Sequence, residues 1–297
     1  VPLLGFLASS LAYLASPLLF WRALAYLALF HFMRQQIGWL RLYRRRAGEH
    51  GRWDARLDEA TLYLAMLYPV LVWHARLPTR FNWFMPGDFV AGVPQSAAQA
   101  AGVLWVLALS AFGARQLQRC RQGRPVSMGK LLLVATTAAT WWSGIVLFAN
   151  DFAFTVTNVV AHGLPYALMA WRVGSARGPL PRTGWQRWLF AHVGRYLLLL
   201  VALAYAEEWL WDAAVWRDHA HIFPAPALHL DVDAWAAVLV PLLALPQLTH
   251  YVLDAYLWRL DGSNPGLAAA LGLSDGRREL SPELAPASHV PSRRWPA

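Results

Sequence analysis

The stretch PQLTHYVLDAYLWR, residues Pro246 to Arg259, closes the last long apolar segment of the chain and contains two ionisable side chains, His250 and Asp254. Residues four apart lie on one face of a helix, so the imidazole and the carboxylate are expected to point the same way. The rest of the segment is typical of a membrane span. Ionisable groups at membrane depth are costly and usually face a partner or a metal inside a helix bundle. The stretch therefore predicts a membrane helix that carries a polar site.

The composition of the whole chain is that of a membrane protein. Of its 297 residues, 57% are hydrophobic and only 14% are charged, which lies outside the range of soluble domains. The net charge of +9 comes from Arg residues clustered between apolar segments. These clusters form no continuous basic face and argue against a nucleic-acid partner. The single Cys120 allows no disulfide and no thiolate metal site, and the composition leaves the oligomeric state open.

The hydropathy pattern predicts an all-α fold, a polytopic bundle of about seven to eight transmembrane helices over residues 1–260. The expected apolar segments are residues 2–15, 18–40, 60–77, 98–116, 131–150, 152–171, 188–211 and 234–258. The polar remainder, residues 261–297, is expected to be a disordered tail. Because the sequence starts at Val1 and is apolar at once, further residues are expected before it.

Strongly basic loops alternate with weakly basic ones along the chain. The basic ones are residues 41–57, 117–130, 172–187 and the C-terminal tail. By the positive-inside rule these parts face the cytoplasm. The pattern predicts a multi-pass protein of the inner (cytoplasmic) membrane, with the lipid bilayer as its partner and its C-terminus in the cytoplasm.

Three intramembrane histidines, His31, His162 and His250, lie on spans that all run from outside to inside. The basic residues that end these spans are Arg41, Arg172 and Arg259, which follow the histidines by 10, 10 and 9 residues. At a rise of about 1.5 Å per residue, the three imidazoles lie at nearly one depth, roughly 15 Å from the cytoplasmic boundary. The shared depth predicts a common metal or cofactor site.

Other polar side chains are expected near this layer. One turn further inward the three helices offer Gln35, Tyr166 and Asp254, which can orient an imidazole; Asp254 is also a candidate ligand, and Asp254 and Tyr166 are candidate catalytic residues. On the sixth span Asn158 is a candidate ligand or holds a water. It belongs to a polar stripe at spacings of 4, 3 and 4, made of Asp151, Thr155, Asn158 and His162.

A second polar layer is expected nearer the outer boundary. Its members are His74, Asp151, Glu207, Glu208 and Asp212. Two interpretations of this layer stay open. The residues either form a second functional site, or they are polar simply because they contact the membrane interface.

The chemistry of three neutral imidazoles in an apolar bundle suits Fe(II), Zn or Cu, and iron with open positions activates dioxygen. The apolar surroundings suit a lipophilic substrate, isoprenoid or lipid-like, that arrives from the bilayer. The sequence therefore favours a membrane oxygenase. Two alternatives remain: a haem b electron-transfer protein with paired His ligands, and a carrier or accessory protein whose polar residues line a path.

Three short patches also carry a resemblance to a known family. HYVLDAYLWR, with His250, Asp254 and Arg259, resembles the C-terminal His-x-x-x-Asp helix of the Brp/Blh family of bacterial membrane β-carotene dioxygenases. FHFMRQQIGW around His31 and NVVAHGLPYALMAW around His162 are similar to that family's other His-bearing spans. The resemblance implies a membrane helix bundle around a His-ligated non-haem iron that cleaves a polyene with dioxygen. It also implies metal-ligand roles for the three histidines.

Overall fold

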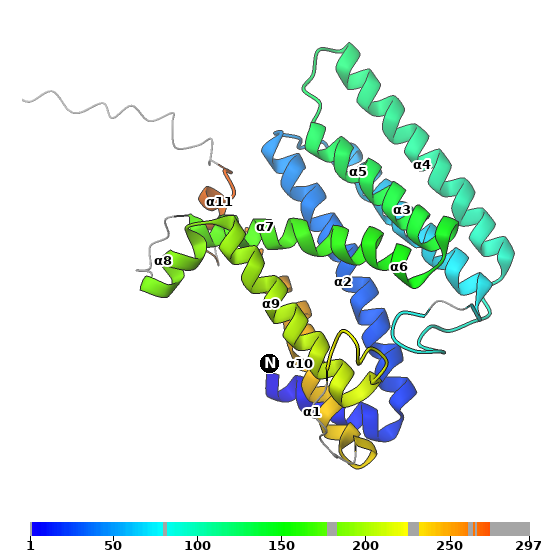
Figure 1. The fold of residues 1–297 in the computed structure, drawn as a ribbon. Coiled ribbons are helices and arrows are strands. Elements are labelled where there is room, and N and C mark those ends of the chain that lie inside the picture. The colour runs from blue at the N-terminus through cyan, green and yellow to red at the C-terminus, as the bar shows by residue number, and fades with distance from the viewer. Residues whose placement is uncertain are drawn as a thin grey trace, which may run out of the picture.

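The computed structural model describes residues 2–79, 82–176, 183–224, 232–260, 264 and 266–273. Within these residues every regular element is a helix and none is a strand, which confirms the all-α class (Figure 1). The elements, with η for a π-helix, are α1 (Pro2–Ala15), α2 (Pro17–Arg46), α3 (Arg52–Arg76), α4 (Gln95–Arg121), α5 (Met128–Trp141), η1 (Trp142–Phe148), α6 (Asp151–Phe154), η2 (Thr155–Val160), α7 (Ala161–Ser175), α8 (Gly184–Phe190), α9 (Val193–Trp211), η3 (Asp212–Trp216), α10 (Val232–Leu257) and α11 (Leu267–Ala270).

Four helical stretches are long and apolar enough to cross a membrane, which marks the chain as a membrane protein. They are Gln95–Arg121, Met128–Phe148, Asp151–Ser175 and Trp235–Leu257. A fifth results if α8 and α9, which are bent by 100° at their junction, form one span. α1 is shorter, and the more polar α2 and α3 do not meet the same criterion of length and composition. The described residues thus contain four to five candidate spans.

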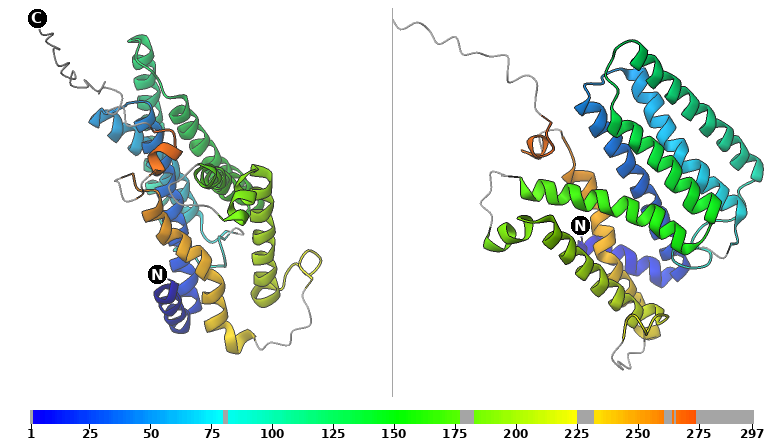
Figure 2. Two further views of the ribbon diagram at one scale, coloured as in Figure 1. Left: turned by 90° about the vertical axis from the view of Figure 1, so that its left-hand side faces the viewer. Right: turned by 45° about the horizontal axis from the view of Figure 1, so that its top comes forward.

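The helices form two groups that share α2. In the first group α3 packs against α2, α4, α5 and η1, around a core that includes Ile37 and Met66. In the second group α1 packs against α10 and against α2, around a core that includes Trp21 and Val240. Figure 2 shows α1 and α10 side by side, with the α6–η2–α7 segment crossing between the groups. This crossing brings α2, α7 and α10 together near the middle of α2.

Part of the expected tail is also ordered. Leu267–Ala270 form α11, which contacts α7, and Leu267 and Leu273 are buried. Residues 274–297 lie outside the described part of the chain.

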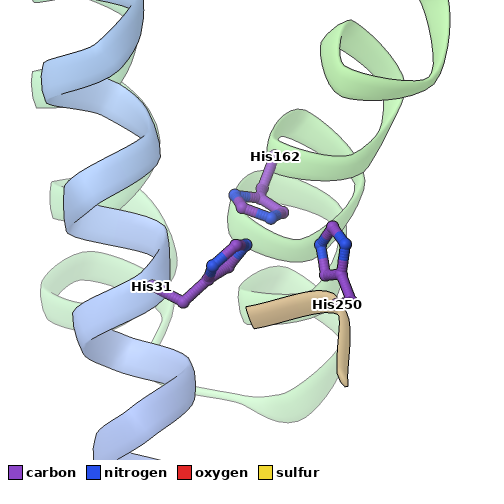
Figure 3. Close-up of side chains that lie close together, drawn as sticks. All are labelled: His31, His162 and His250. Atoms are coloured by element: carbon purple, nitrogen blue, oxygen red, sulfur yellow. The ribbon is translucent and has the colours of Figure 1, made fainter. Parts of the chain in front are cut away.

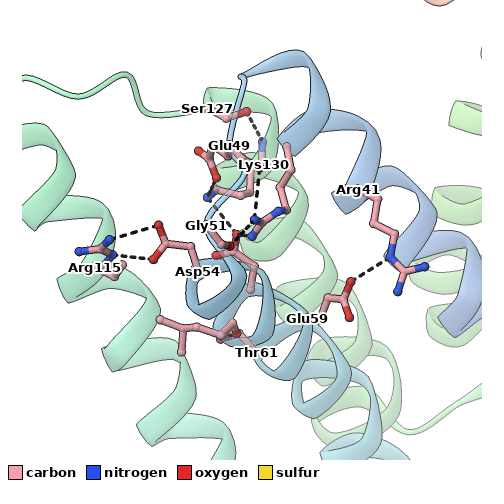
Figure 4. A network of polar contacts seen from close by, with 12 residues as sticks. Arg41, Glu49, Gly51, Asp54, Glu59, Thr61, Arg115, Ser127 and Lys130 are labelled. Atoms are coloured by element: carbon pink, nitrogen blue, oxygen red, sulfur yellow. Dashed lines mark hydrogen bonds and ion pairs between the residues drawn. The ribbon is translucent and has the colours of Figure 1, made fainter. Parts of the chain in front are cut away.

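A network of buried and half-buried charges joins the ends of four helices in the first group (Figure 4). We call it the ion cluster, and its members are Arg44, Glu49, Asp54, Asp58, Arg115, Arg119 and Lys130. Lys130 Nζ of α5 lies 2.6 Å from Glu49 Oε2 and 3.1 Å from Asp58 Oδ2. Arg44 Nη1 of α2 lies 2.6 Å from the same oxygen of Asp58. Lys130 and Asp58 are both fully buried.

Asp54 connects the ion cluster to α4. Its two carboxylate oxygens accept hydrogen bonds from Arg115 Nε at 2.7 Å and Arg119 Nη1 at 3.1 Å. The prediction that residues 41–57 and 117–130 are loops is therefore wrong for most of their length. α2 continues to Arg46, and α3 begins at Arg52, because the acidic side chains allow several of these basic residues to be buried within the bundle.

The ion cluster predicts a specific loss of stability in acid. The hydrogen bond from Arg115 is the main reason why the pKa of the Asp54 carboxyl lies below its usual range, although burial acts in the opposite direction. Because the pKa is lower in the folded state, the stabilisation is complete above the unfolded-state pKa, near pH 4, and is lost as the pH falls through the folded-state pKa. We expect Asp54→Asn to flatten the fall of Tm below about pH 4. Thermal unfolding in detergent measures this, with the exposed Asp151→Asn as control; parallel curves for Asp54→Asn and the native chain would contradict it.

Candidate metal centre

The three histidines meet where α2, α7 and α10 come together. His31 lies at the middle of α2, His162 is the second residue of α7, and His250 lies near the end of α10. Their rings point toward one another (Figure 3). One ligand atom from each residue lies within 4.8 Å of the other two. The ring centroids of His31 and His250 are 4.8 Å apart, and those of His31 and His162 are 5.2 Å apart.

The helix that carries His162 is interrupted on both sides of this residue. The π-helix η2 ends at Val160, and Pro165 follows inside α7. Pro165 has no N–H to donate to the carbonyl of Ala161, so the regular hydrogen-bond ladder is broken just where His162 emerges. π-Helical turns within longer helices are frequent at functional sites. In α10, Pro246 likewise lies one turn before His250.

Aromatic rings hold two of the imidazoles in place. His162 stacks on Phe32 with ring centroids 3.9 Å apart, and His31 stacks on Tyr251 at 4.5 Å. His31 is only 7% exposed. In contrast, the side chain of His250 is 34% exposed. The centre is therefore closed on the side of α2 and open on the side of α10.

Two ring nitrogens of this group are buried without a hydrogen-bond partner, His31 Nε2 and His162 Nδ1. Buried polar atoms are nearly always paired, and each unpaired one calls for an explanation such as an ion. A bond of 2.0–2.1 Å from a metal to each nitrogen limits any two ligand atoms to about 4.2 Å. Small side-chain rotations, on the order of 1 Å or less at the nitrogens, bring the three histidines within that limit. The residues thus fit one ion.

Asp254 lies beside two of the three imidazoles. Its Oδ2 is 3.6 Å from His31 Nε2, and its Oδ1 is 3.5 Å from His250 Nδ1. The same Oδ1 accepts hydrogen bonds from Tyr166 OH at 2.7 Å and from Trp258 Nε1 at 3.3 Å. Distances of 3.5–3.6 Å are too long for a full hydrogen bond, but they place the carboxylate where it can orient the His250 ring through Nδ1 and where it faces the same His31 nitrogen that an ion would occupy. Tyr166 and Trp258 fix the carboxylate in that place.

The expected polar stripe on the sixth span is not formed. It assumed a continuous α-helix from residue 152 to 171, whereas residues 155–160 form the π-helix η2, whose i→i+5 hydrogen bonds change the number of residues per turn. Asp151 and Thr155 are exposed, while Asn158 is buried. The amide nitrogen of Asn158 donates to Thr157 Oγ1 at 2.9 Å and packs against Gly144 of η1. The polar contact of Asn158 is thus with a neighbour in its own helix.

The expected second polar layer does not form one group. Glu208 lies close enough to Glu207 and Asp212 to interact with them electrostatically, whereas His74 on α3 and Asp151 on α6 lie on other helices. His74 lies on α3, where its ring nitrogens contact the carbonyl of Val70 at 2.7 Å and Tyr26 OH at 2.8 Å. Asp212 accepts the backbone N–H groups of Asp218 and His219, both at 3.1 Å. The other three members are exposed: Asp151, Glu207 and Glu208. Within the described ranges, His31, His162 and His250 are the single group of three His, Cys, Asp or Glu residues close enough to hold an ion.

Sequence reasoning overlooked the aromatic residues around the centre. Phe32 and Tyr251 each follow a candidate histidine directly, and Trp258 lies four residues after Asp254, so their positions were a usable signal. Gln35 is expected to orient His31, but both atoms of its amide are buried without a hydrogen-bond partner. The structure therefore does not pair Gln35 with His31.

The arrangement can hold one ion through three neutral nitrogens, with a carboxylate close by. Comparison of the chain with protein-family models, with curated proteins and with solved structures finds no match. What the centre does must therefore be argued from its own geometry.

Proposed function

We propose that this protein is an integral-membrane oxygenase with a His-ligated non-haem metal, iron, that acts on a lipophilic substrate. The observation that carries the proposal is the convergence of His31, His162 and His250 from α2, α7 and α10, with one ligand atom of each lying within 4.8 Å of the other two. The proposal includes seven to eight spans, with α2 and α3 among them, in the inner membrane. The positive-inside pattern supports a cytoplasmic C-terminus.

The ligand set supports iron and oxygen chemistry. Three imidazoles leave coordination positions free, and Fe(II) with open positions activates dioxygen. Asp254 and Tyr166 supply a carboxylate and a phenol on the side of His250, where they can orient a ligand ring and move a proton. The similarity of the three His-bearing patches to the Brp/Blh family favours iron over Zn or Cu.

The spacing of the rings favours a single ion over haem b. A haem with two axial histidines places its porphyrin between the two rings, whereas His31 lies at centroid distances of only 4.8 and 5.2 Å from His250 and His162. A third imidazole at the same point has no role in bis-histidine haem ligation. The carrier alternative differs in requiring no bound metal.

Elemental analysis and an optical spectrum of the detergent-purified chain test the proposal together. We expect about one iron per chain, as the three-histidine set provides for one ion, and no Soret band. A Soret band would replace the proposal with haem b. Purified protein that binds neither iron, zinc nor copper when these are supplied would leave the carrier interpretation.

Asp254→Asn tests the carboxylate separately. Asn keeps the shape of the Asp254 side chain but removes its charge. We expect this change to weaken metal binding by about 10- to 100-fold, because outer carboxylates orient the ligand histidines and increase their basicity. Competition with a chelator of known affinity measures the change. The exposed Asp151→Asn is the matched control, and an effect of less than about twofold would show that Asp254 does not orient the ligands.

A further inference from the structure

The short helix α8 lies almost at a right angle to the helix that follows it. After a break, the continuous helical stretch Val193–Trp216 begins, and the two helices are bent by 100° relative to each other. That stretch alone exceeds the roughly 20 residues that are needed to cross a bilayer. When it spans the membrane, α8 lies close to the membrane plane. Figure 1 shows α8 at the margin of the molecule, beyond the C-terminal end of α7.

Two tryptophan side chains project from one face of α8. Trp185 and Trp188 are three residues apart, which places them on the same side of a helix. Their rings stack with centroids 5.5 Å apart, and the two residues are 57% and 51% exposed. Tryptophan is enriched where a bilayer meets water, because its ring is apolar and its N–H is polar. An in-plane helix with an exposed tryptophan pair therefore fits the boundary between headgroups and acyl chains.

Other side chains of α8 fix this helix to the protein. Leu189 is buried, and Phe190 packs so closely on Gly174 of α7 that a Cβ at this glycine would collide with the phenyl ring. At the N-terminus of α8, Thr183 and Gln186 form a capping box, in which each side chain accepts a backbone N–H of the other residue. The helix thus presents its tryptophan pair in a fixed orientation.

The segment around α8 is positively charged. Between residues 152 and 206 the chain contains five Arg and no Asp or Glu. Arg187 of α8 is exposed. Arg195 of α9 donates a hydrogen bond to the carbonyl of Trp188 at 3.2 Å, and its guanidinium lies 5.1 Å from the centre of that ring. In the ion cluster, by contrast, each Arg meets a carboxylate of the chain. The arginines at α8 therefore suit a phosphate from outside the chain, whose geometry matches a guanidinium.

We propose that α8 is a membrane-surface helix that binds anionic phospholipid in the cytoplasmic leaflet. Trp185 and Trp188 lie at the level of the headgroups, and Arg187 and Arg195 pair with lipid phosphates. The positive-inside pattern places this basic segment on the cytoplasmic side, where anionic lipids are concentrated. The inference does not depend on the proposed oxygenase function, since it involves none of the residues of the metal centre.

Spin-label accessibility tests the position of α8 in the full chain, reconstituted in nanodiscs of phosphatidylglycerol and phosphatidylcholine. Cys120→Ser removes the native thiol, and a nitroxide is attached through Trp185→Cys or, on another face, through Arg187→Cys. We expect oxygen, which concentrates in the bilayer, to relax the label at position 185 more strongly than the label at position 187. A water-soluble nickel chelate is expected to do the reverse. Equal access of both reagents to both labels, or access of neither, would overturn the membrane-surface position.

Photo-crosslinking tests the choice of headgroup. Phosphatidylglycerol and phosphatidylcholine probes, each with a diazirine in the acyl chain near the headgroup, are added separately to nanodiscs of phosphatidylcholine. We expect the phosphatidylglycerol probe to label residues 183–196 at least about fivefold more than the phosphatidylcholine probe. Arg187→Gln is expected to lower this preference about fivefold, and Arg187→Gln with Arg195→Gln to abolish it, because each Arg near an anionic surface contributes about that factor.

Arg56→Gln is the matched control. Arg56 is also exposed and its guanidinium also lies over a tryptophan, Trp53, at 4.9 Å, but it is outside α8. We expect this variant to keep the preference at residues 183–196. Equal labelling by the two lipids in the native chain, or a preference that survives the loss of both arginines, would overturn the inference and leave the proposed metal centre untouched.

Discussion

Single replacement of His31, His162 or His250 by Ala is expected to lower metal affinity by more than about 100-fold. Loss of an outer carboxylate already costs about 10- to 100-fold, and loss of a direct ligand removes a metal–nitrogen bond as well. The buried nitrogens of His31 and His162 have no hydrogen-bond partner, and Asp254, the carboxylate beside the centre, is already held by Tyr166 and Trp258. Metal content after dialysis against a weak chelator measures the effect.

The control for this series is His74→Ala. His74 is also a buried histidine, but its ring is hydrogen-bonded to Tyr26 and Val70, and it does not belong to the group of three histidines. We expect this variant to keep its metal, which separates ligand loss from general damage to the core. Size-exclusion chromatography checks that each variant is folded. Full metal content in all three histidine variants would remove the proposed centre.

The placement of the three histidines follows from the sequence because it depends on local rules. A fixed rise per residue and a basic residue at the end of each predicted span predict a common depth for the three imidazoles. The structure adds to this prediction that α2, α7 and α10 lie next to one another, so that the three histidines meet. The position of Asp254 beside His250 is predictable in the same way, because residues four apart lie on one face of a helix.

Other features were not predictable because they depend on contacts between distant residues. The π-helix η2 changes the direction of Asn158, and an unbroken helical period cannot anticipate it. The ion cluster joins Glu49 to Lys130 across 81 residues. A count of charges along the chain assigns such residues to solvent-exposed loops. Only packing shows that the opposite charges meet and can be buried together.

The ion cluster yields the largest expected change in stability. Lys130→Ala removes the one cation that contacts both Glu49 Oε2 and Asp58 Oδ2, and it leaves these carboxylates with less compensation in a buried place. Removing one partner of a buried ion pair typically costs about 3–5 kcal/mol. We expect a loss of that size in the free energy of unfolding of the detergent-solubilised chain, measured by denaturant titration.

Arg41→Ala is the matched control, because Arg41 pairs with Glu59 at 2.8 Å but its side chain is 56% exposed. An exposed ion pair contributes less than about 1 kcal/mol to the free energy of unfolding. We therefore expect Arg41→Ala to cost much less than Lys130→Ala, because the charges around Lys130 are buried and those of Arg41 and Glu59 are not. Adding Glu49→Gln to Lys130→Ala removes one of the carboxylates left behind. The double variant is therefore expected to be less destabilised than the sum of the single variants. Equal losses for Lys130→Ala and Arg41→Ala would mean that the ion cluster does not hold the helix ends together.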